Sequence, residues 1–137
     1  MNAIETIVQL APADAEAATR AALADQGFGV LTEIDVAAVF HAKLGVDRPF
    51  LKILGACNPH FAQRALHIDP TVSLLLPCNV TIEDVGTGTK IAAVDPLAFM
   101  DDPAFAELGA EVSTRLRRAI DAVNETQTGS AAVSSED

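Results

Sequence analysis

The sequence predicts a single α+β domain, with strands and helices in the approximate order β-α-β-α-β-α-β-β-α. Short apolar segments, several of alternating polarity, are typical of strands, and helix-start and helix-end signals lie between them. The turn Gly86-Thr87-Gly88 separates two such segments, as in a hairpin. Apolar residues also recur at helical spacing over 105–123. We expect one domain over residues 1–125, because a chain of 137 residues, 50% of them hydrophobic, can bury a core without disulfides.

Two strands alternate with two helices in the first third of the chain. The strands are predicted at 4–10 and 29–34, and the helices at 12–26 and 36–44. A glycine directly follows each helix, and Asp35 is a fitting N-cap for the second one. The apolar side chains of that second helix share one face opposite His41, which we therefore expect to face water. The shared face consists of Val36, Val39, Phe40 and Leu44.

The stretch 50–80 is the centre of the chain, because it holds both cysteines and two of the three histidines. An apolar run at 50–56 predicts a buried strand, in which Gly55 allows a close backbone approach. Asn58 is a strong N-cap, and the proline after it suits the first position of a helix. We therefore expect a short helix over 59–67.

A second buried strand is expected at 72–76, where the run is again apolar. Pro77 interrupts this strand, since proline cannot donate to the hydrogen-bond ladder of a sheet. The strand resumes at Cys78. Alternation places the Cys78 side chain with Val80 and Ile82 on the apolar side.

The last part of the chain contains a strand, a long helix and a tail. The strand over 89–94 completes the hairpin. Asp102 followed by proline is typical of a helix start, and the amphipathic pattern continues to Val123. Residues 126–137 are small, polar and acidic, so we expect a disordered tail.

The charge balance excludes several classes of partner. The formal net charge is −10 and the isoelectric point is near 4.5. Nucleic-acid binding and adhesion to anionic membranes both require a basic surface, so neither is expected. The first residues lack the basic region and apolar run of a signal peptide, and no segment is long and apolar enough to span a membrane. We therefore expect a cytoplasmic protein whose two cysteines are thiols.

Several motifs together resemble a known family. The segments KILGACNP (52–59) and LLLPCNV (74–80), the Val-Asp-Pro after the hairpin and the long final helix resemble the domain-of-unknown-function family 302, DUF302. GFGV (27–30) followed by TEIDV (32–36) fits the same pattern, and the likeness covers residues 4–123. The resemblance implies a small α+β domain with an antiparallel sheet packed by helices, often a homodimer, and no assigned activity. The cysteines beside the motifs occur in only part of the family, so the resemblance implies no shared thiol function.

Cys57 is the main candidate for chemistry. It precedes a capped helix start, where backbone amides and the positive end of the helix dipole favour a thiolate. His60 is close enough in sequence to act as its base, so Cys57 and His60 are the candidate catalytic pair. If Cys78 joins them in space, the three are candidate ligands for a soft metal such as copper or zinc, or for haem. The alternative is structural, since free cysteines are often buried and the spacing matches no zinc signature.

Lys52 is the one charged residue in an otherwise apolar strand. Either its face of the sheet is solvated, as on the open side of an antiparallel sheet, or it lines a cavity or a dimer interface. A buried lysine with a lowered pKa would indicate a functional site. The candidate ligand-binding residues of the central stretch are Lys52, Asn58, Cys78 and Asn79.

Two classes of function remain open. The preferred hypothesis is a non-catalytic, homodimeric binding protein for a small ligand, a metal or a protein partner, because no catalytic signature stands out. The alternative is a thiol-dependent redox or transfer enzyme with Cys57 as nucleophile and His60 as base, or a soft-metal or haem site that adds Cys78. The alkylation rates of the two cysteines, with and without a chelator, distinguish these hypotheses.

Overall fold

The computed structural model describes residues 2–98 and 100–136, with side chains as far as residue 126. Its five strands form one antiparallel sheet in the order β1-β5-β4-β3-β2. The strands are β1 (Ala3–Val8), β2 (Gly29–Asp35), β3 (Leu51–Cys57), β4 (Cys78–Asp84) and β5 (Thr89–Val94). The α-helices are α1 (Pro12–Asp25), α2 (Val36–Leu44), α3 (Pro59–Ile68) and α4 (Ala106–Glu136). Three short 3₁₀ helices are η1 (Pro70–Leu75), η2 (Pro96–Ala98) and η3 (Pro103–Phe105). The α+β fold class and the predicted order of the elements are confirmed.

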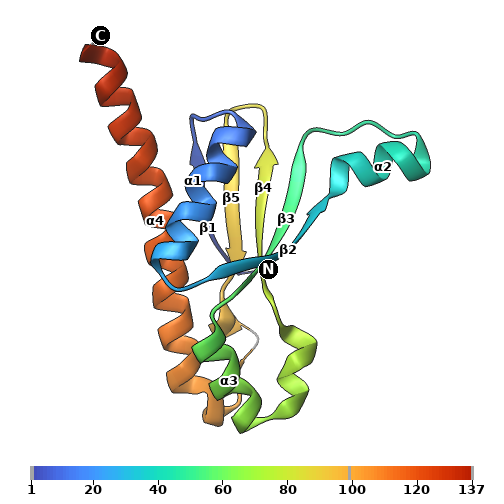
Figure 1. Cartoon of the computed structure of the whole chain (residues 1–137), viewed down its shortest axis with the longest axis vertical. Coiled ribbons are helices and arrows are strands. Elements are labelled where there is room, and N and C mark those ends of the chain that lie inside the picture. Colours follow the sequence, from blue (N-terminus) through green and yellow to red (C-terminus); the bar gives the residue numbers. More distant parts are fainter. Residues whose placement is uncertain (1, 99, 137) are drawn as a thin grey trace.

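The helices are distributed unevenly around the sheet. Helices α1 and α4 cover one face, α3 and η1 lie beyond one end, and α2 projects from the opposite end (Figure 1). Alternate residues of the strands point to the covered face and are fully buried, as Leu54, Ile82 and Ile91 show. Their neighbours point to the other face, which none of the described α-helices covers over β4, β5 and β1. This second face is called the open face below.

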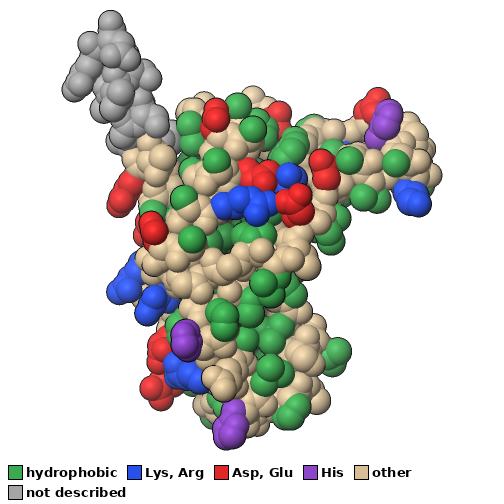
Figure 2. Space-filling model, viewed as in Figure 1, with side chains coloured by type: hydrophobic (Ala, Val, Ile, Leu, Met, Phe, Trp, Pro, Cys, Tyr) green, Lys and Arg blue, Asp and Glu red, His purple; other side chains and the backbone are tan. Residues whose placement is uncertain are grey.

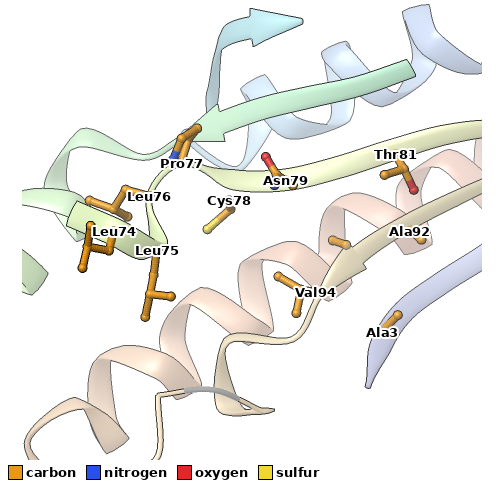
Figure 3. Close-up of a pocket in the computed structure, with 11 residues that line it drawn as sticks. Ala3, Leu74, Leu75, Leu76, Pro77, Cys78, Asn79, Thr81, Ala92 and Val94 are labelled. Atoms are coloured by element: carbon orange, nitrogen blue, oxygen red, sulfur yellow. The ribbon is translucent and has the colours of Figure 1, made fainter. Parts of the chain in front are cut away.

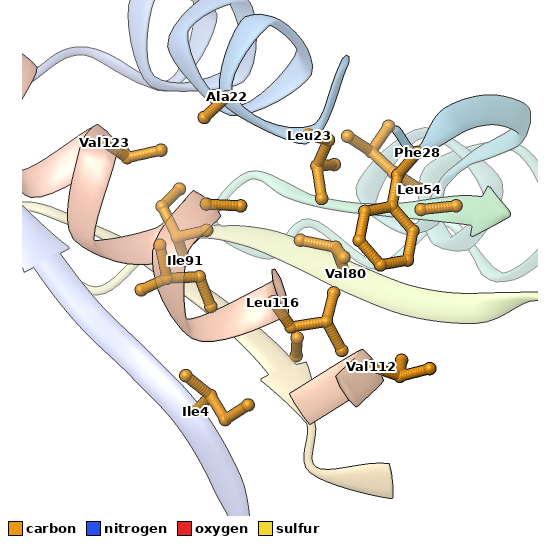
Figure 4. Close-up of a cluster of buried hydrophobic side chains, with 14 of the residues drawn as sticks. Ile4, Ala22, Leu23, Phe28, Leu54, Val80, Ile91, Val112, Leu116 and Val123 are labelled. Atoms are coloured by element: carbon orange, nitrogen blue, oxygen red, sulfur yellow. The ribbon is translucent and has the colours of Figure 1, made fainter. Parts of the chain in front are cut away.

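The hydrophobic core lies between the covered face and the two helices α1 and α4 (Figure 4). The apolar stripe predicted for the last helix is buried along its whole length, which confirms the amphipathic pattern. Its members are Phe105, Leu108, Val112, Leu116, Ala119, Ile120 and Val123. On α1, the small residues Ala15 and Ala22 are buried and allow that helix to lie close to the sheet.

The predicted helix caps are confirmed. The Asp35 carboxylate accepts a hydrogen bond from the backbone amide of Ala38 at 2.9 Å, so the N-terminus of α2 is satisfied by its own neighbour. Gly45 ends the same helix in the left-handed conformation, with φ of 64°. The Asp102 carboxylate caps the turn of η3 by accepting from the amide of Ala104 at 2.9 Å.

The strand predicted at 72–76 is wrong, because residues 70–75 form the 3₁₀ helix η1. The Asp69 carboxylate accepts hydrogen bonds from the amide and the hydroxyl of Thr71, at 3.0 and 2.8 Å, and starts a helical turn. Proline follows Asp69 in the first position of this turn, where its fixed φ suits a helix. A short apolar run fits a buried strand and a helical segment equally well, and here the cap decides. As a result Leu74 is 86% exposed instead of buried.

Helix α2 has the predicted bounds but does not bury its apolar face. None of its nine residues is buried, and Val39, Phe40 and Leu44 are 45%, 37% and 67% exposed. Together with the loop that follows, it forms an arm over residues 36–50 that extends from the sheet (Figure 1). His41 faces water as predicted, and its Nδ1 lies 2.8 Å from the Asp47 carboxylate.

The structure continues α4 to Glu136, while the side chains after residue 126 lie outside the described residues. The disordered tail predicted over 126–137 therefore stays a prediction. Among the helices of the described residues, none has the length and apolar character needed to cross a membrane.

Candidate functional site

A groove of about 460 Å³ lies on the open face, at the end of the sheet nearest η1. Its floor is formed by the ends of β4, β5 and β1, with Thr81, Ala92 and Val94 among the lining residues. Residues 74–77, which connect η1 to β4, form its wall. Figure 3 shows Leu75 and Val94 on opposite sides of the groove, with the sulfur of Cys78 directed toward the Leu75 side.

The position of the groove wall depends on Gly55. This glycine pairs with Asn79 on the neighbouring strand, so it lies directly beside the groove. A β-carbon on Gly55 would overlap the hydroxyl oxygen of Thr32 and would lie 2.8 Å from Cγ of Pro77. The missing side chain therefore allows the ring of Pro77 to rest against the sheet, which confirms the close approach predicted for this glycine.

The groove is predominantly apolar and open to solvent. Leu74 and Leu75 on its wall are 86% and 46% exposed, which is unusual for leucines that lie side by side. Its polar groups are the Thr81 hydroxyl and the Asn79 amide. Beyond Ala3 it adjoins a polar depression lined by acidic residues and by Arg117. This chemistry suits an elongated apolar ligand with one polar or basic end.

Cys57 and Cys78 are free thiols that line one small second cavity, of about 30 Å³, on the covered side of the sheet. Its other walls are apolar side chains of β3, α3 and α4, including Phe61, Leu108 and Val112. Cys78 also lines the groove, so it lies between the two spaces. Burial raises the pKa of the Cys78 thiol to about 11, with a smaller contribution from nearby Cys57. Cys78 is therefore a neutral, core-packed thiol, as its phase in the strand predicts.

His60 is exposed and does not line the cavity that the two cysteines share. Within the described part of the chain, no three His, Cys, Asp or Glu side chains lie close enough together to hold a metal ion. The three-ligand metal site predicted from Cys57, His60 and Cys78 is thus not assembled. The catalytic role of Cys57 stays a prediction.

Asn58, a candidate ligand-binding residue, has a structural role, because it connects the start of α3 to the turn between α1 and β2. It is 8% exposed, and its Oδ1 accepts hydrogen bonds from the amides of His60 and Phe61 at 3.1 and 3.4 Å. Its Nδ2 donates to the carbonyl of Gln26 at 3.4 Å, across the turn between α1 and β2. In that turn Gly27 has φ of 84°, and a β-carbon there would lie 2.8 Å from Asn58 Nδ2. Asn58 therefore holds the start of α3 against the preceding turn.

Lys52 does not lie on a solvated face of the sheet and does not line the groove, while its predicted place at a dimer interface stays a prediction. It lies on the covered face, where its ammonium group is 2.9 Å from the Glu16 carboxylate of α1. Glu16 also binds Arg20 at 2.9 Å, and Arg20 binds Glu33 of β2. The hydrogen bond that Lys52 donates to Glu16 raises the pKa of Lys52, against the opposing effect of burial. Acidic and basic side chains gather beside one another on this part of the surface (Figure 2), and the ion pairs of Lys52 with Glu16 and of Arg20 with Glu33 connect α1 to β3 and β2.

Of the six residues singled out from the sequence, Cys78 and Asn79 line the groove. The wall and most of the floor were missed. Small residues at alternate positions of β5 and β4, such as Ala92 and Thr81, are the sequence signal that fits an uncovered face. The exposed leucines of the wall gave no usable signal, because their run was interpreted as a buried strand.

Comparisons with known proteins place the fold and leave the groove without an assigned role. The family model described as Domain of unknown function DUF302 matches residues 4–123, which include the wall and all of the floor except Ala3. The crystal structure of an uncharacterized conserved protein DUF302 from Bacillus stearothermophilus is similar, with a TM-score of 0.83 and 29% sequence identity. That similarity covers 90% of this chain and 98% of the other. Among curated proteins, none matches the chain.

Proposed function

The chain belongs to the DUF302 family of domains of unknown function, and from that premise we propose that it is a non-catalytic, homodimeric binding protein. Its ligand is an elongated apolar molecule or segment, held in the groove on the open face. The observation that carries this proposal is the groove itself. Its volume of about 460 Å³ lies within the range of ligand sites, and its apolar lining includes few polar groups.

The burial pattern around the groove supports a binding role. Leu74 and Leu75 on the groove wall are 86% and 46% exposed. A bound ligand would cover this apolar surface. The wall is held in place by the contact of Pro77 with Gly55, so the site is largely pre-formed. Pre-formed apolar sites lose little conformational entropy on binding.

Titration with the neutral apolar dye Nile red tests the proposal. We expect saturable binding with one dye molecule per chain, and at least roughly tenfold weaker binding to Ala92→Leu, whose larger side chain fills the floor. Ala17→Leu is the matched control, because it makes the same change at an exposed position of α1. Equal dye affinity of the two variants would exclude the groove as the site.

The homodimer is supported by the uncovered arm. A helix whose apolar face is exposed in the monomer gains stability when a second chain covers that face. Light scattering after size-exclusion chromatography tests this, and a chain that stays monomeric at micromolar concentration counts against the dimer. The proposed location is the cytoplasm, which fits two free thiols.

A further inference from the structure

The arm is apolar, and its own domain leaves it uncovered. Val39, Phe40 and Leu44 of α2 and Val46 of the following loop are 45%, 37%, 67% and 47% exposed. Of the elements of the sheet, α2 makes its main contact with β3 alone. The sheet lacks a cover of its own on one side, since none of the described helices lies over β4, β5 and β1 on the open face.

The arm of one chain lies too far from the groove of the same chain to enter it. The arm starts where β2 ends, beside the first residues of β3, whereas the groove lies beside the last residues of β3 (Figure 1). Strand β3 has seven residues, so its two ends are roughly 20 Å apart. A two-fold axis that reverses the strand direction would place the arm end of one copy beside the groove end of the other.

We propose that the arm of a second copy of this chain occupies the groove, reciprocally, so that each chain caps the groove of its partner. This inference rests on the proposed function of the groove and names its occupant. The nine-residue helix α2 is about 13.5 Å long. The three strands of the groove floor span about 10 Å, so the helix can lie across them.

The arm helix carries a cation, and carboxylates lie beside the groove. Helix α2 carries Lys43 and no carboxylate, although the whole chain has a net charge of −10. Beyond Ala3, the groove adjoins a depression that contains Glu5, Asp95 and Arg117, in which Glu5 and Asp95 bind Lys90 and Arg117 of their own chain at 3.4 and 2.8 Å. Lys43 at the tip of the arm can therefore approach acidic groups while the apolar residues of α2 cover the leucines of the wall.

Pairing between β2 edges is the competing mode of association, and the residues of β2 disfavour it. An antiparallel pairing of this strand with itself, centred on Ile34, would place Glu33 of one copy opposite Asp35 of the other. The register shift between Val30 and Thr32 also interrupts the strand, as is typical of edges protected from pairing. The arm, in contrast, offers the exposed apolar side chains of Val39, Phe40 and Leu44.

Occupation of the groove by the partner's arm has a consequence for ligand binding. The arm and a ligand would compete for one groove, so the proposed homodimer would be the ligand-free form, and a bound ligand would displace the partner's arm. Dye bound per chain should then fall by about threefold or more as the wild-type concentration rises through the dimer dissociation constant. The variant Phe40→Asp/Leu44→Asp should remain monomeric and bind the dye equally well at all concentrations.

Cross-linking between two differently labelled chains tests the contact directly. A ¹⁵N-labelled chain with Leu44→Cys is mixed with an unlabelled chain with Leu74→Cys, and a short bis-maleimide is added. Both positions are exposed, so neither substitution disturbs the core. The expected product is a cross-link between peptides of different label that contain residues 44 and 74. In the control pair, the unlabelled chain carries Ile7→Cys in place of Leu74→Cys. Ile7 is 48% exposed and lies at the far end of β1 from the groove.

The outcomes separate this inference from the function on which it rests. A 44–74 cross-link in clear excess over the 44–7 control supports the inference. A dimer that gives no such excess, or that survives Phe40→Asp/Leu44→Asp, overturns it, while dye binding in the groove keeps the proposed function. If even the monomeric variant does not bind the dye, the ligand site is refuted. The 44–74 cross-link alone then decides whether the arm occupies the groove.

Discussion

Gly55→Ala should destabilise the protein, because the position beside the groove has no room for a β-carbon. The added atom would overlap the Thr32 hydroxyl oxygen and lie 2.8 Å from Cγ of Pro77, well inside van der Waals contact. Overpacking of this kind costs about 1–3 kcal/mol. We expect the upper half of that range, since one of the two neighbours is a proline ring that belongs to the groove wall. Thermal unfolding should then show a Tm lower by roughly 10 °C.

Two further variants identify the cause of this loss. Thr32→Ala removes one of the two overlapping atoms, so Gly55→Ala/Thr32→Ala should recover about 1 kcal/mol relative to additivity in a double-mutant cycle. Gly29→Ala is the matched control, because its β-carbon would lie 4.0 Å from the nearest atom, the carbonyl oxygen of Cys57. That change should be neutral or stabilise by a few tenths of a kcal/mol through the unfolded chain. Equal stability of the Gly55 and Gly29 variants would refute the packing argument.

Three other predictions concern charge, the thiol and the cap. Burial alone would raise the pKa of Glu16, but hydrogen bonds and charges from Lys52 and Arg20 lower it below its usual 4.5. The ionised Glu16 therefore stabilises the folded protein above pH 4.5, and this stabilisation is lost as the pH falls through the lowered pKa of the folded state. Chemical denaturation at pH 5 and pH 3 should thus show a larger loss of free energy of unfolding for wild type than for Glu16→Gln. Cys78, with a pKa of about 11, should alkylate slowly at pH 8 and rapidly once the chain is unfolded in urea; rapid reaction of the native protein would contradict its burial. Asn58→Ala should cost about 1–2 kcal/mol of stability because α3 loses its cap, whereas a change below ~0.3 kcal/mol would show that solvent replaces these bonds.

Local signals in the sequence predicted most of the elements, because each acts within a few residues. Asp35 and Gly45 delimit α2, and Asn58 starts α3, through hydrogen bonds and backbone angles that belong to the segment itself. The buried stripe of α4 follows in the same way from its helical period. These features need no knowledge of what the segment packs against.

The misses arose where the outcome depends on distant parts of the chain or on a competing local signal. The apolar run at 72–76 was assigned to a strand, although the cap at Asp69 favours a helical turn. Lys52 has its partner on α1, 36 positions earlier in the chain, which no local pattern reveals. The apolar face of α2 was identified correctly, but periodicity indicates only that a face is apolar and says nothing of whether the same chain covers it. The groove depends on the first of these features, because its wall is the segment that connects η1 to β4, and this is why sequence reasoning did not find it.

The two thiols help to decide between a binding protein and a thiol enzyme. A nucleophilic cysteine acts as a thiolate, but Cys78 is held neutral by burial, and the base predicted for Cys57 is the exposed His60, which does not line the cavity of the thiols. An enzyme would therefore depend on Cys57 alone, without a partner in that cavity to accept its proton. A binding groove needs none of these groups, and its wall and floor are already in place. Alkylation of native Cys57 at neutral pH is the measurement that bears on this argument: a rate at or above that of a free thiol would support the enzyme, whereas protection would favour the proposed binding groove.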